Sequence, residues 1–422
     1  MNNAYADLDP SALAKLLKTL QEQYDLCSAN KMALDLTRGK PASEQLALSD
    51  GLDDMIDGDY LATDGTDVRN YGGLRGLPEA RELGAAIMGL PAEAVIAGGN
   101  SSLTLMHFVV ACALEQGVVG PAWRQGDEPV RILTPVPGYD RHFALSENFG
   151  IEMVNVAMTD AGPDMQQAAE LAAADPQIKG IWCVPKYANP TGCVYSPGTV
   201  EALAALPKQA AADNFLVLYD NAYAVHDLEF PGVALSSIFD AAAKAHTADH
   251  IVQFASTSKI TYAGGGIAFI ASSETTLQSL EEPMSFMMIG PDKVNQLRHA
   301  RFLTGRIEAH MQAHAAIIKP KFDIVIEALR AELTGIATWT EPTGGYFISL
   351  QMAPGTASAM VELAKGAGLT LTRAGATYPY GYDPQDANVR IAPTFASLAD
   401  LPSAMAILTL CVRLATAKAF KE

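Results

Sequence analysis

The chain has few cysteines, no clustered histidines and no long apolar run, and each absence excludes a class of protein. Its 5 cysteines are scattered and form no CxxC pair, which argues against a disulfide framework and against a zinc site. The 8 histidines show no metal-type spacing, so no metal is expected. No run approaches the roughly 20 apolar residues of a membrane span, and the first residues form an acidic, amphipathic segment unlike a leader. We therefore expect a cytoplasmic protein with no membrane partner.

Positive charge is scarce as well. The 29 lysines and arginines face 47 acidic residues, which gives a formal net charge of -18, and no dense basic run interrupts this excess. Such a surface repels nucleic-acid backbones, so no nucleic-acid partner is expected. The 422 residues are 49% hydrophobic and 18% charged, as in an ordinary globular chain of two or three packed units.

Short apolar runs alternate with helix-length segments over the first two thirds of the chain. The seven runs span residues 94–99, 130–136, 151–158, 180–185, 215–220, 251–256 and 267–272. Apolar strands separated by helices predict a three-layer α/β/α unit with a mostly parallel, seven-stranded sheet. Only a glycine-rich turn separates the last two runs, so an antiparallel strand is expected there.

A different pattern follows residue 290. A long helical stretch over residues 294–333 leads into the strand-like segments YFISL, LTLTRAG and NVRIAPTF and a final helix. We expect a large domain over residues 50–310, and a smaller α+β domain formed by residues 1–49 and 311–422.

One apolar run ends in hydroxyl side chains and a lysine. In IVQFASTSK, Ser256 and Ser258 precede Lys259, and the glycine-rich TYAGGGIAF follows. A buried strand has no packing use for an ammonium at its end, and hydroxyls suit a phosphate. The segment therefore favours pyridoxal 5'-phosphate held on Lys259 as a Schiff base. Taken alone, the segment fits a strand that ends in a solvated lysine equally well.

Asp220 and Tyr223, in FLVLYDNAY, follow another apolar run at the edge where open α/β sheets bind ligands. A buried carboxylate there would keep a pyridine nitrogen protonated, and the tyrosine would donate to the phenolic oxygen of the same ring. An aspartate at the end of a strand is also common turn chemistry, so this pair is weak evidence by itself.

Three further strand ends suit the same ligand. The ANPTG turn can aim the Asn189 amide at the phenolic oxygen, and Tyr139 in PGYDRHF can stack on a flat ring. Ser101 and Ser102 in GGNSSL fall at a helix N-terminus, which favours a phosphate. A tight turn, a core aromatic and ordinary helix capping are the respective alternatives.

Arg390, in NVRIAPTF, is a cation in an otherwise apolar strand. A guanidinium in such a place needs a partner, and a bidentate carboxylate is the natural one. The alternative is a structural ion pair with one of the 47 acidic residues.

In their order, GGNSSL, PGYDRHF, ANPTG, YDNAY, STSK and NVRIAPTF resemble the class I/II aminotransferases of pyridoxal-phosphate fold type I, over roughly residues 38–395. The chain is most similar to a divergent bacterial aspartate aminotransferase subgroup related to the aminotransferase half of MocR-type regulators. The resemblance implies a transaminase that moves an amino group from an amino acid, with L-aspartate expected, to 2-oxoglutarate. It also implies a Lys259 Schiff base and a pyridoxamine intermediate.

The resemblance implies a role for each matching residue. Lys259 is the Schiff-base lysine and the proton shuttle, and Asp220 pairs with the pyridine nitrogen. Tyr223 and Asn189 contact the phenolic oxygen, and Tyr139 stacks on the ring. The residues at the phosphate-binding positions are Ser101, Ser102, Ser256 and Ser258.

The resemblance also covers substrate and partner contacts. Arg390, supported by Asn189, binds the substrate α-carboxylate, and Gly39 in TRGKP lies near it. Tyr71 matches a tyrosine that reaches the phosphate of the neighbouring subunit, which implies a homodimer with shared active sites. One departure concerns the phosphate, because Ile267 stands where many family members carry an arginine.

Three questions stay open at this level. A cysteine-conjugate β-lyase would use the same ring-binding residues, so it is the alternative activity. A non-catalytic, cofactor-sensing regulator is less expected, because only 37 residues precede Arg38, too few for a DNA-binding domain. The cation that binds a distal substrate carboxylate is not fixed, and the candidates are Arg38, Lys40, Arg141 and Lys293.

Overall fold

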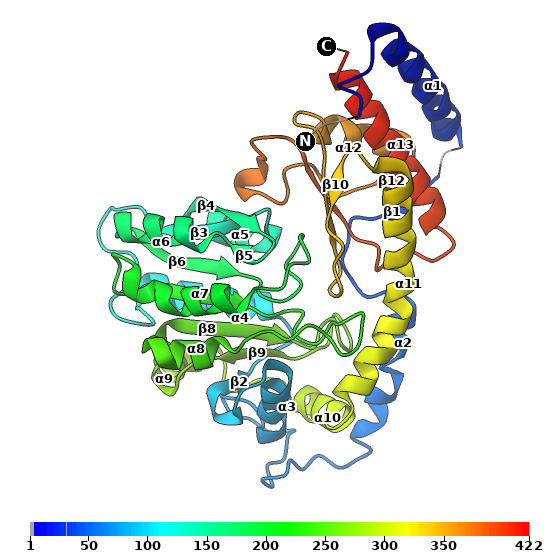
Figure 1. Ribbon diagram of the computed structural model, residues 1–422. Coiled ribbons are helices and arrows are strands. Elements are labelled where there is room, and N and C mark those ends of the chain that lie inside the picture. Colours follow the sequence, from blue (N-terminus) through cyan, green and yellow to red (C-terminus); the bar gives the residue numbers. More distant parts are fainter. Residues whose placement is uncertain (1–3, 31, 422) are drawn as a thin grey trace.

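The computed structural model describes residues 4–30 and 32–421, and its two parts lie side by side (Figure 1). Residues 1–3, 31 and 422, which fall in the predicted small domain, lie outside the described residues. Within the described ranges the strands form an eight-stranded sheet, a three-stranded sheet and a two-stranded pair.

The large sheet confirms the predicted strands and adds one. Its order is β2 (Val95–Ala97), β9 (Ala268–Ala271), β8 (Ile251–Ser256), β7 (Leu216–Asp220), β6 (Ile178–Cys183), β3 (Arg131–Val136), β4 (Glu152–Thr159) and β5 (Gly162–Pro163). β9 runs antiparallel to both neighbours, as its glycine-rich connection predicted. The eighth strand, β5, pairs antiparallel with β4 and has only two residues, too short for any hydrophobic period to reveal.

Helices cover both faces of this sheet, which confirms the α/β class. One face carries α4 (Ser102–Glu115) and α9 (Glu274–Met287), and the other carries α6 (Met165–Ala174), α7 (Pro197–Gln209) and α8 (Ile238–Ala245) (Figure 1). The residues of β7 alternate between the faces. Leu216 and Leu218 join the core beneath α4, and Val217 and Tyr219 join the core beneath α7. α5 (Asp140–Asn148) follows β3 and contacts β4.

The second part is built from both ends of the chain. Its elements are α1 (Pro10–Ala29), β1 (Leu34–Asp35), α2 (Ser43–Ala47), β10 (Thr338–Trp339), β11 (Ile348–Gln351), α12 (Ala357–Gly366), β12 (Leu369–Thr370), β13 (Asn388–Ile391) and α13 (Leu401–Ala419). β1 pairs in parallel with β12, which ties the N-terminal segment to the C-terminal one (Figure 1). β11 lies between β10 and β13 in an antiparallel sheet.

By length and composition alone, α13 is apolar enough to cross a membrane, which the sequence had not suggested. The helix packs against α1, α11 and α12, and 67% of its apolar window is buried in the protein. These contacts are those of a core helix, whose apolar surface is already covered.

The long helix predicted over residues 294–333 is two helices. α10 (Lys293–Leu303) ends before Gly305, whose φ of 73° is left-handed, and α11 (Ile307–Leu333) follows. The remaining large helix, α3 (Pro78–Met88), packs against α10. α11 runs along both parts of the molecule (Figure 1), and the expected boundary near residue 310 falls inside it. The division into two domains stays a prediction.

Two histidines buried in these helices make stability depend on pH. Burial is the main cause that lowers the pKa of His299 and of His314 to about 4. Unfolded histidine titrates near 6.5, so below that pH the unfolded chain binds protons that the folded chain excludes. The free energy of unfolding in urea should therefore be highest above pH 6.5. It should fall toward pH 4 by about 1.4 kcal/mol per pH unit for each histidine.

Two substitutions test this assignment. His299→Gln should reduce the slope of the free energy of unfolding between pH 4 and 6.5 by about 1.4 kcal/mol per pH unit, the contribution of one proton. His107→Gln, at an exposed position of α4, should leave this slope unchanged. An unaltered slope in His299→Gln would contradict the assignment.

Candidate active site

The ends of neighbouring parallel strands bring the predicted residues to one edge of the large sheet. Asp220 is the last residue of β7, and Ser256 is the last residue of β8. Asn189 follows β6, and Tyr139 follows β3. Since β3, β6, β7 and β8 are parallel, their carboxyl ends share this edge.

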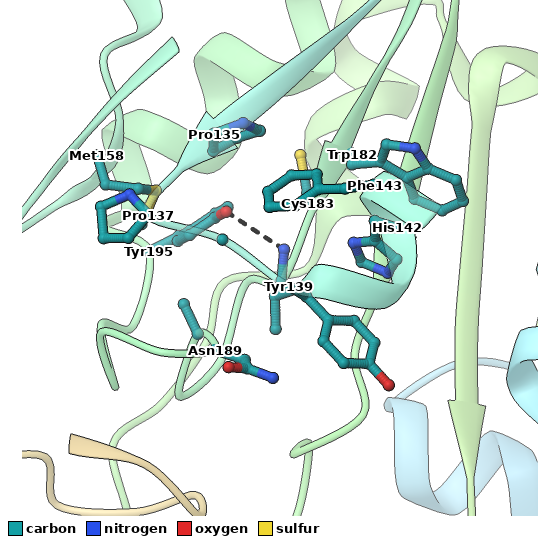
Figure 2. A pocket seen from close by; sticks show the side chains of 13 residues that line it. Pro135, Pro137, Tyr139, His142, Phe143, Met158, Trp182, Cys183, Asn189 and Tyr195 are labelled. Atoms are coloured by element: carbon teal, nitrogen blue, oxygen red, sulfur yellow. Dashed lines mark hydrogen bonds between the residues drawn. The ribbon is translucent and has the colours of Figure 1, made fainter. Parts of the chain in front are cut away.

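Asp220 is buried and has one free oxygen. Its Oδ2 accepts a hydrogen bond from His142 Nε2 at 3.0 Å, while its Oδ1 has no partner among the described residues. His142 stacks on Trp182, with ring centroids 4.3 Å apart, and meets the edge of Tyr139 at 4.9 Å. Figure 2 shows His142 between these two rings. A buried, unpaired carboxylate oxygen is costly, so this atom points to a donor that a ligand would supply.

Lys259 lies in the turn after β8, close to Tyr223. Its Nζ is 4.7 Å from the centroid of the Tyr223 ring and makes no hydrogen bond among the described residues. Loss of hydration lowers the pKa of Lys259, and the nearby Asp220 carboxylate acts in the opposite direction. An amine of lowered pKa more readily loses its proton and becomes a nucleophile or a base.

Arg390 sits beside Asn189, as the resemblance predicted. Its guanidinium donates to Asn189 Oδ1 at 3.2 Å and to Asp140 Oδ1 at 2.9 Å, and it lies 4.8 Å from the centroid of the Phe347 ring. Gly39 packs so closely on Phe347 that an added Cβ would come within 2.2 Å of the ring. The pair with Asp140 matches the structural alternative, yet the buried Nε of Arg390 has no partner in the described chain.

The serines predicted to bind a phosphate come from two segments that contact each other. Ser258 Oγ donates to the carbonyl of Asn100 at 3.0 Å, and the side-chain amide of Asn100 donates to the Gly264 carbonyl at 2.9 Å. Ser101 caps α4 by accepting from the Thr104 amide, and Ser102 is the first residue of that helix. Capping and phosphate binding are therefore both compatible with this helix end.

Ile267 contributes no charge to these hydroxyls. Its side chain is fully buried, and its amide donates to Thr257 Oγ1 at 2.9 Å. The side chain at position 267 packs in the core, so a cation for a phosphate has to come from another residue.

Tyr71, which is predicted to reach the phosphate of a neighbouring subunit, lies on the surface of this chain. Its side chain is 83% exposed, while the buried Lys293 donates to the carbonyls of Tyr71 and Gly72 at 3.0 and 2.9 Å. These two bonds use two of the three protons of the Lys293 ammonium. Among the other candidates for the distal carboxylate, Lys40 lies 3.8 Å above the Phe395 ring.

Sequence reasoning missed two aromatic contacts and one histidine. His142 follows Tyr139 by three residues in PGYDRHF, so one helical turn places both side chains on the same face. That spacing was a usable signal for His142. Trp182 and Phe347 gave none, because their roles depend on the packing of distant segments.

Comparison with known proteins agrees with this geometry. Residues 8–422 match the family model described as aspartate amino-transferase. An aspartate aminotransferase of Corynebacterium glutamicum is 43% identical over 422 residues, covering 98% of this chain and 96% of that protein. The crystal structure of an aspartate transaminase from the same organism shares 40% identity and a TM-score of 0.95, and 100% of each chain is covered.

A more distant solved structure shares the fold alone. An α-aminoadipate aminotransferase of Thermus thermophilus, complexed with N-(5'-phosphopyridoxyl)-L-leucine, has a TM-score of 0.75 and 18% identity over 92% of this chain and 93% of that one. The protein is thus an aminotransferase of pyridoxal-phosphate fold type I. Within this class, the chain belongs to the aspartate aminotransferase family.

Proposed function

We propose that this aminotransferase passes the amino group of L-aspartate to 2-oxoglutarate, with pyridoxal 5'-phosphate bound at the edge of β7 and β8. One observation carries the proposal. The amine of Lys259, which has no hydrogen bond, and the unpartnered oxygen of Asp220 lie at the ends of neighbouring strands, where an amine and a carboxylate can serve one ligand. The named Corynebacterium relatives support the choice of aspartate.

The residues present fit this cofactor. Asp220 Oδ1 offers an acceptor for a protonated pyridine nitrogen, and Asn189 and Tyr223 are buried donors for the phenolic oxygen. The N-terminus of α4 offers free backbone amides for a phosphate, and the Ser101 hydroxyl, whose oxygen accepts from the Thr104 amide, keeps its proton for the same group. Pyridoxal phosphate supplies an electron sink for the charge that develops when an amino acid loses its α proton.

The protein's own groups bind the substrate and move the proton. Arg390 keeps Nε free for a carboxylate, and the ring of Phe347 covers one side of its guanidinium. Lys259 Nζ accepts the α proton and returns it, because its lowered pKa leaves more of the amine unprotonated near neutral pH. Burial of Asp220 and Asn189 keeps water away from these groups.

We further propose a cytoplasmic homodimer in which Tyr71 reaches the partner's site. Its backbone is fixed by Lys293 while its ring is 83% exposed, as suits a side chain held out for a second copy. Phe286, Met287 and Ile289 are also 78%, 62% and 66% exposed on the segment that precedes Lys293. Exposed apolar side chains of this size are typical of an interface.

The visible spectrum of the cofactor-loaded protein tests the proposed reaction. L-aspartate alone should remove the visible band of bound pyridoxal phosphate, and 2-oxoglutarate should restore it. A band that persists with aspartate and responds to another amino acid would overturn the substrate. Pyruvate and ammonia released without a keto acid would instead indicate a β-lyase.

A further inference from the structure

The main chain of Lys259 lies in an isolated turn whose carbonyls need partners. The amides of Ile260 and Thr261 both donate to the Thr257 carbonyl at 2.8 Å, but no helix continues the turn. Among the described residues, no backbone amide donates to the carbonyl of Lys259 or of Ile260. Buried carbonyls without donors are costly, so side chains have to satisfy them.

Three side chains supply the missing donors. The Lys259 carbonyl accepts from the Tyr346 hydroxyl and from His226 Nε2, each at 3.3 Å. The Ile260 carbonyl accepts from His310 Nε2 at 2.8 Å, and His314 Nε2 lies 3.2 Å from that nitrogen. These side chains come from the loop after β7, from α11 and from the segment before β11.

Gln45 fixes the proton position of Tyr346. The side chain is fully buried, and its Oε1 accepts from the Ala42 amide at 3.0 Å. Its Nε2 donates to the Tyr346 oxygen at 2.9 Å and lies 3.3 Å from His314 Nδ1. The single proton of Tyr346 is therefore left for the Lys259 carbonyl.

His226 is held neutral in the same arrangement. Nε2 must carry the proton that goes to the Lys259 carbonyl, and the buried Nδ1 has no partner among the described residues. A second proton on Nδ1 would have no acceptor. In agreement, burial holds the pKa of His226 well below its usual range.

We propose that Gln45 and Tyr346 are positioning residues for Lys259, acting with His226 and His310 to hold its main chain still. This inference rests on the proposed role of Lys259. With both carbonyls fixed, only the side chain of Lys259 moves as Nζ carries the proton. The turn therefore sets the position of the Lys259 Cα, from which this side chain extends. Misplacement of a reacting group by about 1 Å can cost about 100-fold in rate.

Tyr346→Phe and Gln45→Met test the inference in the full-length, cofactor-loaded protein. Each removes donors from the set and leaves a side chain of similar size. We expect kcat to fall about 10- to 100-fold, while KM for both substrates stays within about twofold. Hydrogen exchange of the Ile260 and Thr261 amides, followed by mass spectrometry, should accelerate at least about tenfold.

A buried asparagine at the other end of β7 gives the matched control. Asn214 is 1% exposed and donates to the Pro121 carbonyl at 2.9 Å, so Asn214→Leu removes a comparable buried hydrogen bond. It should lower the thermal midpoint and leave kcat and the exchange of the two amides unchanged. The inference is overturned if Tyr346→Phe and Gln45→Met behave like Asn214→Leu in both measurements, or if kcat falls without faster exchange.

The exchange measurement also separates this inference from the proposed reaction. Faster exchange in the variants, in a protein that does not act on aspartate, would uphold the positioning set and refute the substrate. Normal transamination with unchanged exchange and kcat in both variants would uphold the substrate and refute the positioning set.

Discussion

Lys259→Ala should keep pyridoxal phosphate bound and lose about 10²- to 10⁴-fold in kcat, because the variant removes the base that we propose moves the α proton. The other proposed cofactor contacts come from side chains that the substitution leaves in place, such as Asp220 and Asn189. Cofactor content after gel filtration and kcat with L-aspartate and 2-oxoglutarate are the measurements. Retained turnover would end the proposal that this lysine carries the chemistry.

The buried lysines of the described chain are poor candidates for this role, because hydrogen bonds already hold their amines. Lys186 donates to the Ala224 carbonyl at 3.0 Å and pairs with Asp227 at 2.9 Å. Lys321 donates to Glu44 at 2.8 Å and to the Thr394 carbonyl at 2.9 Å. Lys293 holds the loop of Tyr71 in the same way. Lys259 is half-buried, and loss of hydration lowers the pKa of its amine, which makes no hydrogen bond among the described residues.

Two further substitutions are the controls for this result. Lys259→Arg keeps a cation of similar length that cannot lose its proton at neutral pH, so it should be nearly as inactive as the alanine variant. Lys319→Ala removes an exposed lysine of α11 that pairs with Asp323 at 2.8 Å, and it should leave kcat unchanged.

The strands that carry the chemistry were predictable because they are continuous and apolar. Residues 215–220 and 251–256 read as buried strands and fold as β7 and β8 with almost the same bounds. Parallel neighbours end at the same edge, so Asp220 and Lys259 were expected to meet there. The helix break near residue 305 was not predicted, because a turn of three residues interrupts the period of a long helix too briefly to be seen.

Most of the predicted site residues come from motifs that stand at a strand end, while Arg390 lies inside β13. What the sequence did not show is the set of contacts between segments far apart in the chain. Gln45 and Tyr346 are 301 positions apart and His142 and Asp220 are 78 apart, and neither pair shares a local pattern. Such partners follow from contacts between distant elements, such as α2 with α11 and α5 with β4, which no short-range periodicity encodes.

The partner of Arg390 could not be identified from the sequence either. Its isolation in an apolar strand predicted a carboxylate partner, but the sequence could not say whether a substrate or the protein supplies it. The structure gives a protein carboxylate, Asp140, at 2.9 Å and still leaves Nε buried without a partner. Both interpretations are therefore compatible with the structure, because a guanidinium has five donors and one ion pair uses only part of them.

Asp220→Asn is expected to lower kcat with L-aspartate about 100- to 1,000-fold, while the cofactor remains bound. The substitution keeps the shape of the side chain and removes the buried negative charge that we propose faces the pyridine nitrogen. A preorganised charge in a dry site is worth this much in the transition state. The rate at which L-aspartate bleaches the visible band of the loaded enzyme isolates the first half-reaction and is the measurement.

His142 holds the Asp220 carboxylate in place through a hydrogen bond to Oδ2. Since His142 Nε2 donates to Oδ2, and Oδ1 is the oxygen left free, the histidine orients the carboxylate without using the oxygen that faces the ligand. His142→Gln should therefore cost less than Asp220→Asn, about tenfold, because the charge remains. Asp175→Asn loses an ion pair with Arg131 at the opposite end of the sheet and should leave the rate unchanged. Equal rates in Asp220→Asn and Asp175→Asn would mean that the buried charge of Asp220 does not act on the reacting ring.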